Sequence, residues 1–357
     1  MNFFLLALIL IIVIGIKIKG PGEFNKDYLE KKNTTAINGI FVILVVFSHY
    51  AQYADLGGIY DRGYLAVKAH LSQMIVASFL FYSGYGMMES LKKKGCSYIL
   101  RLPVRFLKLL FKFDCAVLLF ILMNMALGIT YPRHQTLFAF TGWESIGNSN
   151  WYIFDILILY MLMLAAFSIA SVCPYTVKHT AGVIILTFAT IGFIIVMRKA
   201  GKDAFWYNTL MLFPAGAVYS LVKHNAERLV MRSDFTYFFS MLVVLAGYLY
   251  GSSHRTGYGI QTYIGWSIMF MLLLLLITMK VSVYNGFLEF LGRHVFSIYI
   301  LQRIPMTILS QYGYIEKNKY ACLIAVMLMT IVMALAFERV TDACIDTAGK
   351  LCGAEKR

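Results

Sequence analysis

The sequence predicts an all-α protein that crosses a membrane many times, with about ten core transmembrane helices and one additional N-terminal span. Two observations predict this class. Hydrophobic residues make up 60% of the 357 residues and charged residues only 14%, whereas soluble domains are normally about 25% charged. Apolar runs of roughly 20 residues, the length that crosses a bilayer, also cover nearly the whole chain. We therefore expect one polytopic unit rather than two soluble domains.

About eleven apolar segments meet this length rule. They are residues 3–18, 34–53, 70–88, 106–128, 151–172, 181–197, 205–221, 235–251, 260–279, 287–309 and 320–337. The first segment is short, but Lys17 and Lys19 follow it where a signal peptide would have a small-residue cleavage site. We therefore expect an uncleaved span and a cytoplasmic linker in residues 1–33, a membrane domain over residues 34–339 and a cytoplasmic tail over residues 340–357.

The net charge of +14 reflects membrane topology rather than binding to nucleic acid. Basic residues cluster in residues 17–32, 92–112 and 223–232, which fall on one side of the membrane if the spans are assigned correctly. The positive-inside rule makes that side cytoplasmic, so the N-terminus and the loop around Gly57 should lie outside. Residues 198–202 carry positive charge on the outer side and leave open whether the neighbouring spans are assigned correctly.

The six cysteines are placed so that no pair shares an oxidising compartment. Two of them, Cys115 and Cys322, fall within predicted spans. The cysteines on the predicted cytoplasmic side are Cys96, Cys173, Cys344 and Cys352. We expect no disulfide, and because no C-x-x-C spacing occurs we expect no cysteine-bound metal. The sequence also lacks nucleotide-binding loops and the motifs of soluble hydrolases.

Two polar residues interrupt the second apolar segment. Asn38 and His49 are eleven residues apart, which is close to three helical turns and puts both on one face, roughly 16 Å apart along the axis. Ionisable groups inside a span are costly and usually face a cavity or a partner. His49 is therefore either a functional residue or a side chain at the headgroup interface. Asn38 either belongs to the same polar stripe or joins neighbouring helices.

The third apolar segment ends in small residues between aromatic ones. Ser83, Gly84 and Gly86 are typical of close helix packing. The alternative is a narrow passage whose wall includes Tyr82, Ser83 and Tyr85.

Arg101 and Arg105 follow in the basic loop, four residues apart and hence on one helical face. Two guanidinium groups on one face suit a phosphate group. The alternative is that both arginines serve only the positive-inside topology.

Further polar residues mark the fifth and tenth segments. Trp151 and Tyr152 open the fifth segment, where they indicate an aromatic belt at the outer surface. Asp155 lies about one turn further in, where a carboxylate needs a partner. In the tenth segment, Gln302 and Arg303 lie deep, and Arg303 is expected to extend outward toward the interface.

Five segments resemble, in the same order, the integral membrane acyltransferase family three. They are residues 38–49, 79–85, 98–105, 150–154 and 291–302. The similarity covers residue 34 to about residue 339, which leaves the first segment as an addition. Two positions depart from the family pattern. Asn38 stands where the family has arginine or lysine, and Gln302 stands where it often has histidine.

The resemblance implies transfer of an acyl group, most often acetyl, from cytoplasmic acyl-CoA to a hydroxyl of an extracytoplasmic cell-surface glycan. It implies that His49 is the general base and that Asn38, on the same helix face, lies near the entrance for the acyl donor. The residues expected to hold the acyl-CoA are Arg101, Arg105, Tyr82 and Ser83. The residues expected to hold the acceptor are Trp151, Tyr152, Asp155 and Gln302.

The expected partners follow from the function that the resemblance implies. Acyl-CoA is a co-substrate, and we expect no permanently bound cofactor and no metal. Membrane lipid and the glycan are the other partners, nucleic acid is not one, and the location is the cell inner (plasma) membrane. The residues do not identify the glycan, the acyl chain length or the oligomeric state.

Two other classes of function remain open. A transporter or flippase uses intramembrane polar residues equally well, although no inverted repeat is visible. A family relative that has lost activity and acts as a scaffold of glycan export is the second class, because Asn38 replaces a basic residue. Binding of CoA to the purified protein distinguishes the enzyme from both.

Overall fold

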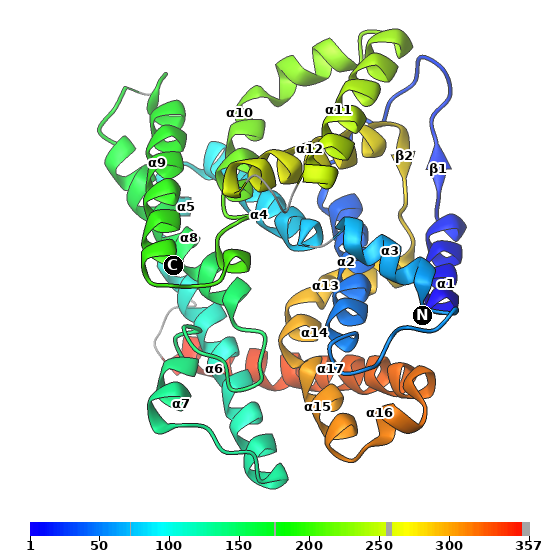
Figure 1. Cartoon of the computed structure of the whole chain (residues 1–357). Coiled ribbons are helices and arrows are strands. Elements are labelled where there is room, and N and C mark those ends of the chain that lie inside the picture. The colour runs from blue at the N-terminus through cyan, green and yellow to red at the C-terminus, as the bar shows by residue number, and fades with distance from the viewer. Residues whose placement is uncertain (72, 175, 255–258, 352–357) are drawn as a thin grey trace.

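The computed structural model describes residues 1–351 except 72, 175 and 255–258, and nearly all of its elements are helices (Figure 1). The first helices are α1 (Asn2–Ile14), α2 (Lys31–Tyr50), α3 (Arg62–Leu71), α4 (Met74–Lys94), α5 (Cys96–Ile99), α6 (Leu102–Leu127), α7 (Arg133–Ala139), α8 (Trp151–Ala170) and α9 (Lys178–Lys199). After the 3-10 helix η1 (Ala204–Trp206) come α10 (Leu212–Val230), α11 (Asp234–His254), α12 (Ile260–Lys280), α13 (Gly286–Arg293), α14 (Val295–Leu301), α15 (Arg303–Gln311), α16 (Tyr314–Lys317) and α17 (Lys319–Leu351). The strands of the described part, β1 (Lys17–Ile18) and β2 (Val281–Ser282), pair antiparallel.

The protein is a multi-pass membrane protein, but the predicted count of about ten core spans plus one is not confirmed. Among the described helices, α2, α8, α9, α11, α12 and α17 are long and apolar enough to cross a membrane, and α3 with α4 makes a seventh candidate. The 13 residues of α1 give only about 20 Å of helix, whereas a bilayer core is about 30 Å thick. α10 is not among these candidates, and its second half carries the charged residues Lys223, Glu227 and Arg228.

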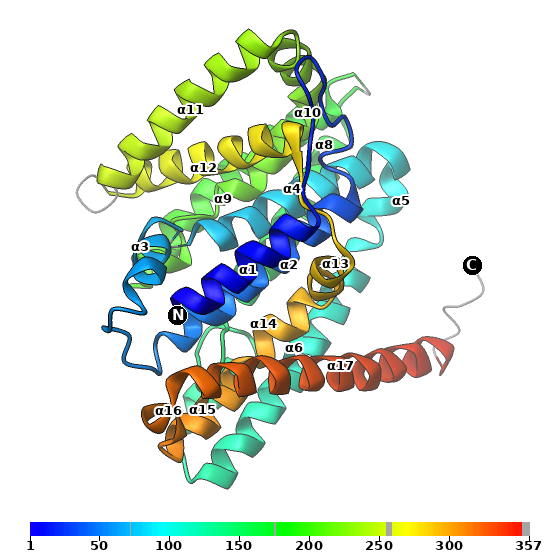
Figure 2. The same ribbon diagram turned by 90° about the vertical axis from the view of Figure 1, so that its right-hand side faces the viewer.

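Polar contacts show which helix termini lie together at each of the two opposite ends of the bundle. We call the end that holds the start of α2 and the end of α4 the inner end, after the predicted cytoplasmic side. There, Lys280 at the end of α12 donates to the Gly20 carbonyl (2.9 Å) and pairs with Asp234 at the start of α11 (2.8 Å). At the outer end, Lys202 after α9 donates to the Trp143 carbonyl before α8 (2.7 Å). In Figure 2, α12 runs from side to side in the upper part and α17 in the lower part, and α1 lies diagonally between them.

Glycines bring two pairs of helices into backbone contact. A Cβ on Gly39 of α2 would lie 2.0 Å from the Leu288 carbonyl oxygen of α13, and one on Gly292 of α13 would lie 1.8 Å from the Thr35 carbonyl oxygen of α2. Because backbone atoms cannot move aside as a flexible side chain can, only glycine allows this approach.

The same arrangement joins α4 to α10. A Cβ on Gly84 would lie 1.9 Å from the Phe213 carbonyl oxygen, and one on Gly216 would lie 2.1 Å from the Phe81 carbonyl oxygen. The close-packing interpretation of the small residues in this segment therefore holds for Gly84, while a Cβ on Gly86 would meet no atom within 4 Å.

The predicted span over residues 287–309 is three short helices, α13, α14 and α15. Pro305 explains the second break, because proline has no N–H to donate to the Leu301 carbonyl and its ring collides with that carbonyl in a continuous helix. In the observed arrangement Pro305 lies in the first turn of α15, where proline is tolerated. The break places Gln302 and Arg303 at the junction of two helices.

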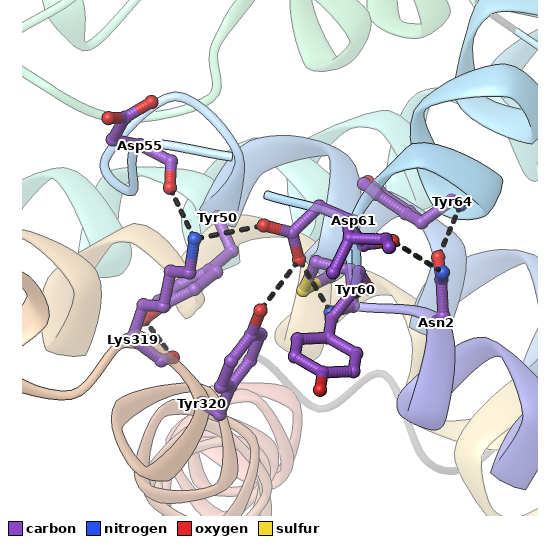
Figure 3. A network of polar contacts seen from close by, with 10 residues as sticks. Asn2, Tyr50, Asp55, Tyr60, Asp61, Tyr64, Lys319 and Tyr320 are labelled. Atoms are coloured by element: carbon purple, nitrogen blue, oxygen red, sulfur yellow. Dashed lines mark hydrogen bonds and ion pairs between the residues drawn. The ribbon is translucent and has the colours of Figure 1, made fainter. Parts of the chain in front are cut away.

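A buried carboxylate ties the outer ends of three segments together (Figure 3). Asp61, before α3, accepts from the N-terminal ammonium of Met1 (2.7 Å), from Lys319 (2.9 Å) and from the Tyr320 hydroxyl (3.1 Å). Burial raises the pKa of Asp61, but these hydrogen bonds outweigh it and lower the pKa to about 2. The network holds α1 and α17 against the loop after α2.

The described cysteine side chains Cys115, Cys173, Cys322 and Cys344 are free thiols. The side chains of Cys96 and Cys352 lie outside the described part, so the predicted location of Cys96 stays a prediction.

Candidate active site

Two cavities lie at opposite ends of α2 and α4. The inner cavity, of about 910 Å³, is lined by the first half of α2, which includes Asn38, and by α4 from Phe79 to Lys93, which includes Tyr82 and Ser83. The outer cavity, of about 1000 Å³, is lined by the end of α2, which includes His49, and by the loop before α8. Both reach the upper end of the roughly 300–1,000 Å³ range of small-molecule sites.

The inner cavity has an excess of cationic over anionic side chains. Its basic residues are Lys26, Lys31, Lys93 and Lys223, and its acidic residues are Asp27, Glu30 and Glu89. Glu89 already pairs with Lys92 (2.5 Å) and accepts from the Ser220 hydroxyl (2.7 Å). Lys26, Lys31 and Lys93 are exposed and make no ion pair within the described residues. Anionic groups are therefore attracted to this cavity.

The outer cavity combines an aromatic wall with polar side chains. Trp143, Trp151, Trp206 and Phe205 line it. Trp143 and Trp206 lie 6.3 Å apart by ring centroid, and Trp151 and Phe205 lie 5.8 Å apart. The loop before α8 is held in place by its own side chains, since the Asn150 amide donates to the Gly142 carbonyl (2.7 Å).

Four rings, which we call the aromatic partition, lie between the two cavities: Phe79, Tyr152, Tyr299 and His49. Their successive centroids are 6.2, 5.5 and 6.0 Å apart. Phe79, Tyr152 and Tyr299 line the inner cavity, whereas His49 lines the outer cavity. Neighbouring residues of α8 divide in the same way, because Trp151 faces the outer cavity and Tyr152 the inner one.

Five buried polar atoms in and beside the two cavities have no hydrogen-bond partner within the described residues. They are Asn38 Oδ1, Tyr82 Oη, Tyr299 Oη, His49 Nδ1 and Gln302 Oε1. Buried polar atoms are nearly always bonded to protein or to water, so each exception needs an explanation. Asn38, Tyr82 and Tyr299 line the inner cavity, His49 lines the outer cavity, and Gln302 lies next to His49, so polar atoms without a partner are found on both sides of the aromatic partition.

His49 lies beside two cations and one amide. Arg303 and Lys68 are the charged groups that act on its imidazole, and the Gln302 side chain lies next to it. Gln302 is fully buried and donates to the Tyr299 carbonyl (3.0 Å), which fixes its orientation. The structure therefore brings Gln302 next to His49. Gln302 is not among the residues that line the outer cavity, and its predicted contact with the acceptor stays a prediction.

Arg101 and Arg105 do not join this arrangement. Neither is among the residues that line the two cavities. The Arg105 guanidinium instead donates to the Tyr98 hydroxyl (2.8 Å) and lies over that ring, 4.7 Å from its centroid. Both arginines are exposed, and their predicted contact with phosphates stays a prediction.

Asp155 is also apart from both cavities. Its side chain is fully buried in α8, and both carboxyl oxygens lack a partner within the described residues. It acts electrostatically on Tyr152 and Tyr299, so it lies behind the aromatic partition rather than in the outer cavity. Its predicted contact with the acceptor stays a prediction.

Sequence reasoning missed three cations of the outer cavity: Lys68, Lys202 and Arg303. Lys202 belongs to residues 198–202, whose positive charge on the predicted outer side indicated this cavity wall. The predicted span over residues 205–221 is not among the described helices that are long and apolar enough to cross a membrane, because α10 begins only at Leu212 and continues into charged residues. For Arg303 the signal was Pro305, which ends α14 and begins α15 at this point.

The comparison with family models decides the class of protein. The acyltransferase family 3 model, described as an acyltransferase domain, matches residues 35–338. The chain belongs to acyltransferase family 3. The resemblance seen in the sequence is thereby confirmed. No match was found among the curated proteins or among the solved structures.

Membership in acyltransferase family 3 supports a transferase enzyme and favours it over a transporter. Acyl transfer needs a base near the attacking hydroxyl, and His49 is an imidazole at the boundary of the two cavities. In the described part of the chain, no group of three or more His, Cys, Asp or Glu side chains is placed to hold a metal ion.

Proposed function

We propose that this protein transfers an acyl group from acyl-CoA in the inner cavity to a hydroxyl of an extracytoplasmic glycan in the outer cavity, with His49 as the general base. The observation that carries the proposal is that two large cavities approach each other at the aromatic partition, with the unpartnered atoms of Asn38, Tyr82 and Tyr299 on the inner side and of His49 on the outer side. The reacting groups would meet at the aromatic partition, in the inner (plasma) membrane of the cell.

The donor enters from the inner end. Coenzyme A carries several phosphates, and Lys26, Lys31 and Lys93, which make no ion pair within the described residues, outnumber the two unpaired carboxylates of the cavity, Asp27 and Glu30. The acyl-bearing arm would extend past Asn38 and Tyr82 toward Tyr299. The amide of Asn38 and the two tyrosine hydroxyls offer hydrogen bonds to the amides of that arm.

The reaction at His49 is an ordinary acyl transfer. The acceptor oxygen attacks the thioester carbonyl carbon while the imidazole takes the hydroxyl proton. The tetrahedral intermediate collapses, the carbon–sulfur bond breaks, and the thiolate receives the proton from the imidazolium. General-base help of this kind contributes roughly 10²–10⁴-fold to the rate. Gln302, which lies next to His49 and is itself held by the Tyr299 carbonyl, would keep the imidazole in position while it takes and returns the proton.

The test uses purified protein in lipid nanodiscs with acetyl-CoA and a mixture of cell-surface oligosaccharides. We expect His49→Gln to lower thiol release and sugar acetylation by at least about 100-fold, because glutamine cannot take up a proton near neutral pH. Binding of acetyl-CoA should be unchanged. The matched control is Ser48→Ala, the adjacent residue that also lines the outer cavity. Normal turnover in His49→Gln would overturn the role of His49.

A further inference from the structure

The outer cavity contains two positive charges that make no ion pair with a described carboxylate. Lys202 is paired with Glu144 (3.7 Å) and lies over the Trp143 and Trp206 rings. Arg303 and Lys68 make no ion pair within the described residues. The other acidic residue of the cavity, Asp203, is exposed after α9, whereas Arg303 and Lys68 both act on His49. Positive charge is therefore concentrated beside the proposed reacting hydroxyl.

Neutral partners hold the Arg303 guanidinium in place. Its Nε donates to Ser149 Oγ (2.9 Å), Nη2 to Gln52 Oε1 (2.8 Å) and Nη1 to the Tyr53 hydroxyl (3.4 Å). Guanidinium has five N–H donors, so one hydrogen on each terminal nitrogen is left over. Two such hydrogens on one planar group suit the two oxygens of a carboxylate or phosphate. A fixed cation of this kind costs little further ordering when it binds an anion.

The aromatic wall fits the rest of a sugar. Trp143, Trp151 and Trp206 offer flat apolar faces to the C–H face of a pyranose, and the cavity also has amide and hydroxyl side chains for its hydroxyl groups. A neutral sugar needs only these features. The two unpaired cations are an extra element, and burying them beneath a neutral ligand would be unfavourable.

We propose that the acceptor is an acidic sugar, one that carries a carboxylate or phosphate group, and that Arg303 and Lys68 bind that group. This inference rests on the proposed function because it assigns the acceptor to the outer cavity. The inference goes further because it names the charge of the substrate and the two residues that bind the charged group.

Intrinsic fluorescence provides a direct binding assay, because three of the four tryptophans of the chain line this cavity. The probes are p-nitrophenyl β-glucuronide, p-nitrophenyl β-glucoside 6-phosphate and the neutral p-nitrophenyl β-glucoside, which share ring and aglycone. For the natural protein in nanodiscs we expect at least one anionic probe to bind about tenfold more tightly than the glucoside, since 1.4 kcal/mol of charge-assisted bonding is a factor of ten. The two anionic probes distinguish carboxylate from phosphate.

The variants identify the residues. Lys68→Gln removes a charge that makes no hydrogen bond to a described residue, and Arg303→Gln removes the second charge. Each should reduce the preference for the anionic probe several-fold while leaving glucoside affinity unchanged. Lys202→Gln is the matched control, because its charge is already paired with Glu144, and it should keep the preference.

Equal affinity for all three probes, no binding of any probe, or a preference that survives both Lys68→Gln and Arg303→Gln would overturn the inference. The acetylation assay separates this result from the proposed function. Selective binding of an anionic probe without His49-dependent acetyl transfer would overturn the proposed acyltransferase activity alone. Acetyl transfer to a neutral sugar with no anionic preference would overturn the acidic-sugar inference alone.

Discussion

At the scale of single residues, lysines and not the paired arginines lie at the inner cavity. We expect Lys31→Ala with Lys93→Ala to weaken acetyl-CoA binding roughly five- to tenfold, because each removes an unpaired charge from the cavity wall. Arg101→Ala with Arg105→Ala should change it less, since Arg105 already binds Tyr98. Isothermal titration at low and high salt measures both. The lysine effect should shrink as salt increases, and a larger loss in the arginine variant would restore the sequence-based assignment.

Asp61 makes a second residue-scale prediction. Its folded pKa of about 2 lies below the ordinary value of 3.8, so the carboxylate stabilises the folded state at any pH above the ordinary value. This contribution is lost as the pH falls from about 4 to about 2. Asp61→Asn should destabilise the protein by roughly 3 kcal/mol near neutral pH, because it leaves buried cations without their partner.

Melting temperatures of the detergent-solubilised protein test this difference. The gap between the natural protein and Asp61→Asn should stay constant from pH 8 to pH 5 and narrow below pH 4. Asp55→Asn is the control, because Lys319 binds only the main-chain carbonyl of Asp55. A gap that does not depend on pH would mean that the carboxylate charge is not the stabilising feature.

At the scale of helices, the glycine contacts determine how closely α4 and α10 approach. Gly84→Ala places a Cβ 1.9 Å from the Phe213 carbonyl oxygen, so a backbone has to move and we expect a loss of roughly 1–3 kcal/mol. Gly192→Ala, in α9, meets no atom within 4 Å and should be neutral or stabilising because alanine favours helix. Thermal unfolding followed by circular dichroism compares the two, and equal stability would contradict the proposed contact.

The sequence predicted the helical segments well where apolar length alone decides. The ranges over α8, α9 and α12 differ from the observed ones by a few residues at most. It predicted the tenth segment poorly, because residues 287–309 are apolar throughout while the break depends on the geometry of one proline, Pro305. The length of an apolar segment carries no information about such a break. The position of Arg303, which depends on the break, could therefore not be predicted either.

In the candidate site, too, local pattern could be predicted from the sequence and tertiary contacts could not. Helical spacing placed Asn38 and His49 on one face, and the two residues line the inner and the outer cavity. Spacing along one helix does not reveal which residues of other helices come near. Lys68 reaches His49 from α3, and Arg303 reaches it from α15, more than 250 residues later in the chain. Such tertiary neighbours are set by packing and not by local pattern.

At the scale of the whole molecule, the outer and inner ends predict a topology. Cys344 is exposed at the inner end of α17 and should be cytoplasmic, whereas Gly57, before α3, should be outside. In a background that lacks the other cysteines, an impermeant maleimide should label Gly57→Cys in intact cells but label Cys344 only after permeabilisation. Labelling of Cys344 in intact cells would invert the orientation and exchange the donor and acceptor cavities.

The aromatic partition also has an electrical consequence. When the two cavities fill with water on opposite sides of a membrane, the insulating layer between them is shortened to the rings of Phe79, Tyr152 and Tyr299, and these rings would then be the barrier to ion leakage. Moving one elementary charge across 100 mV involves about 2.3 kcal/mol. In the proposed reaction the acyl group moves outward as a proton moves inward to the thiol, and the exchange carries no net charge. Turnover would therefore neither draw on the membrane potential nor discharge it.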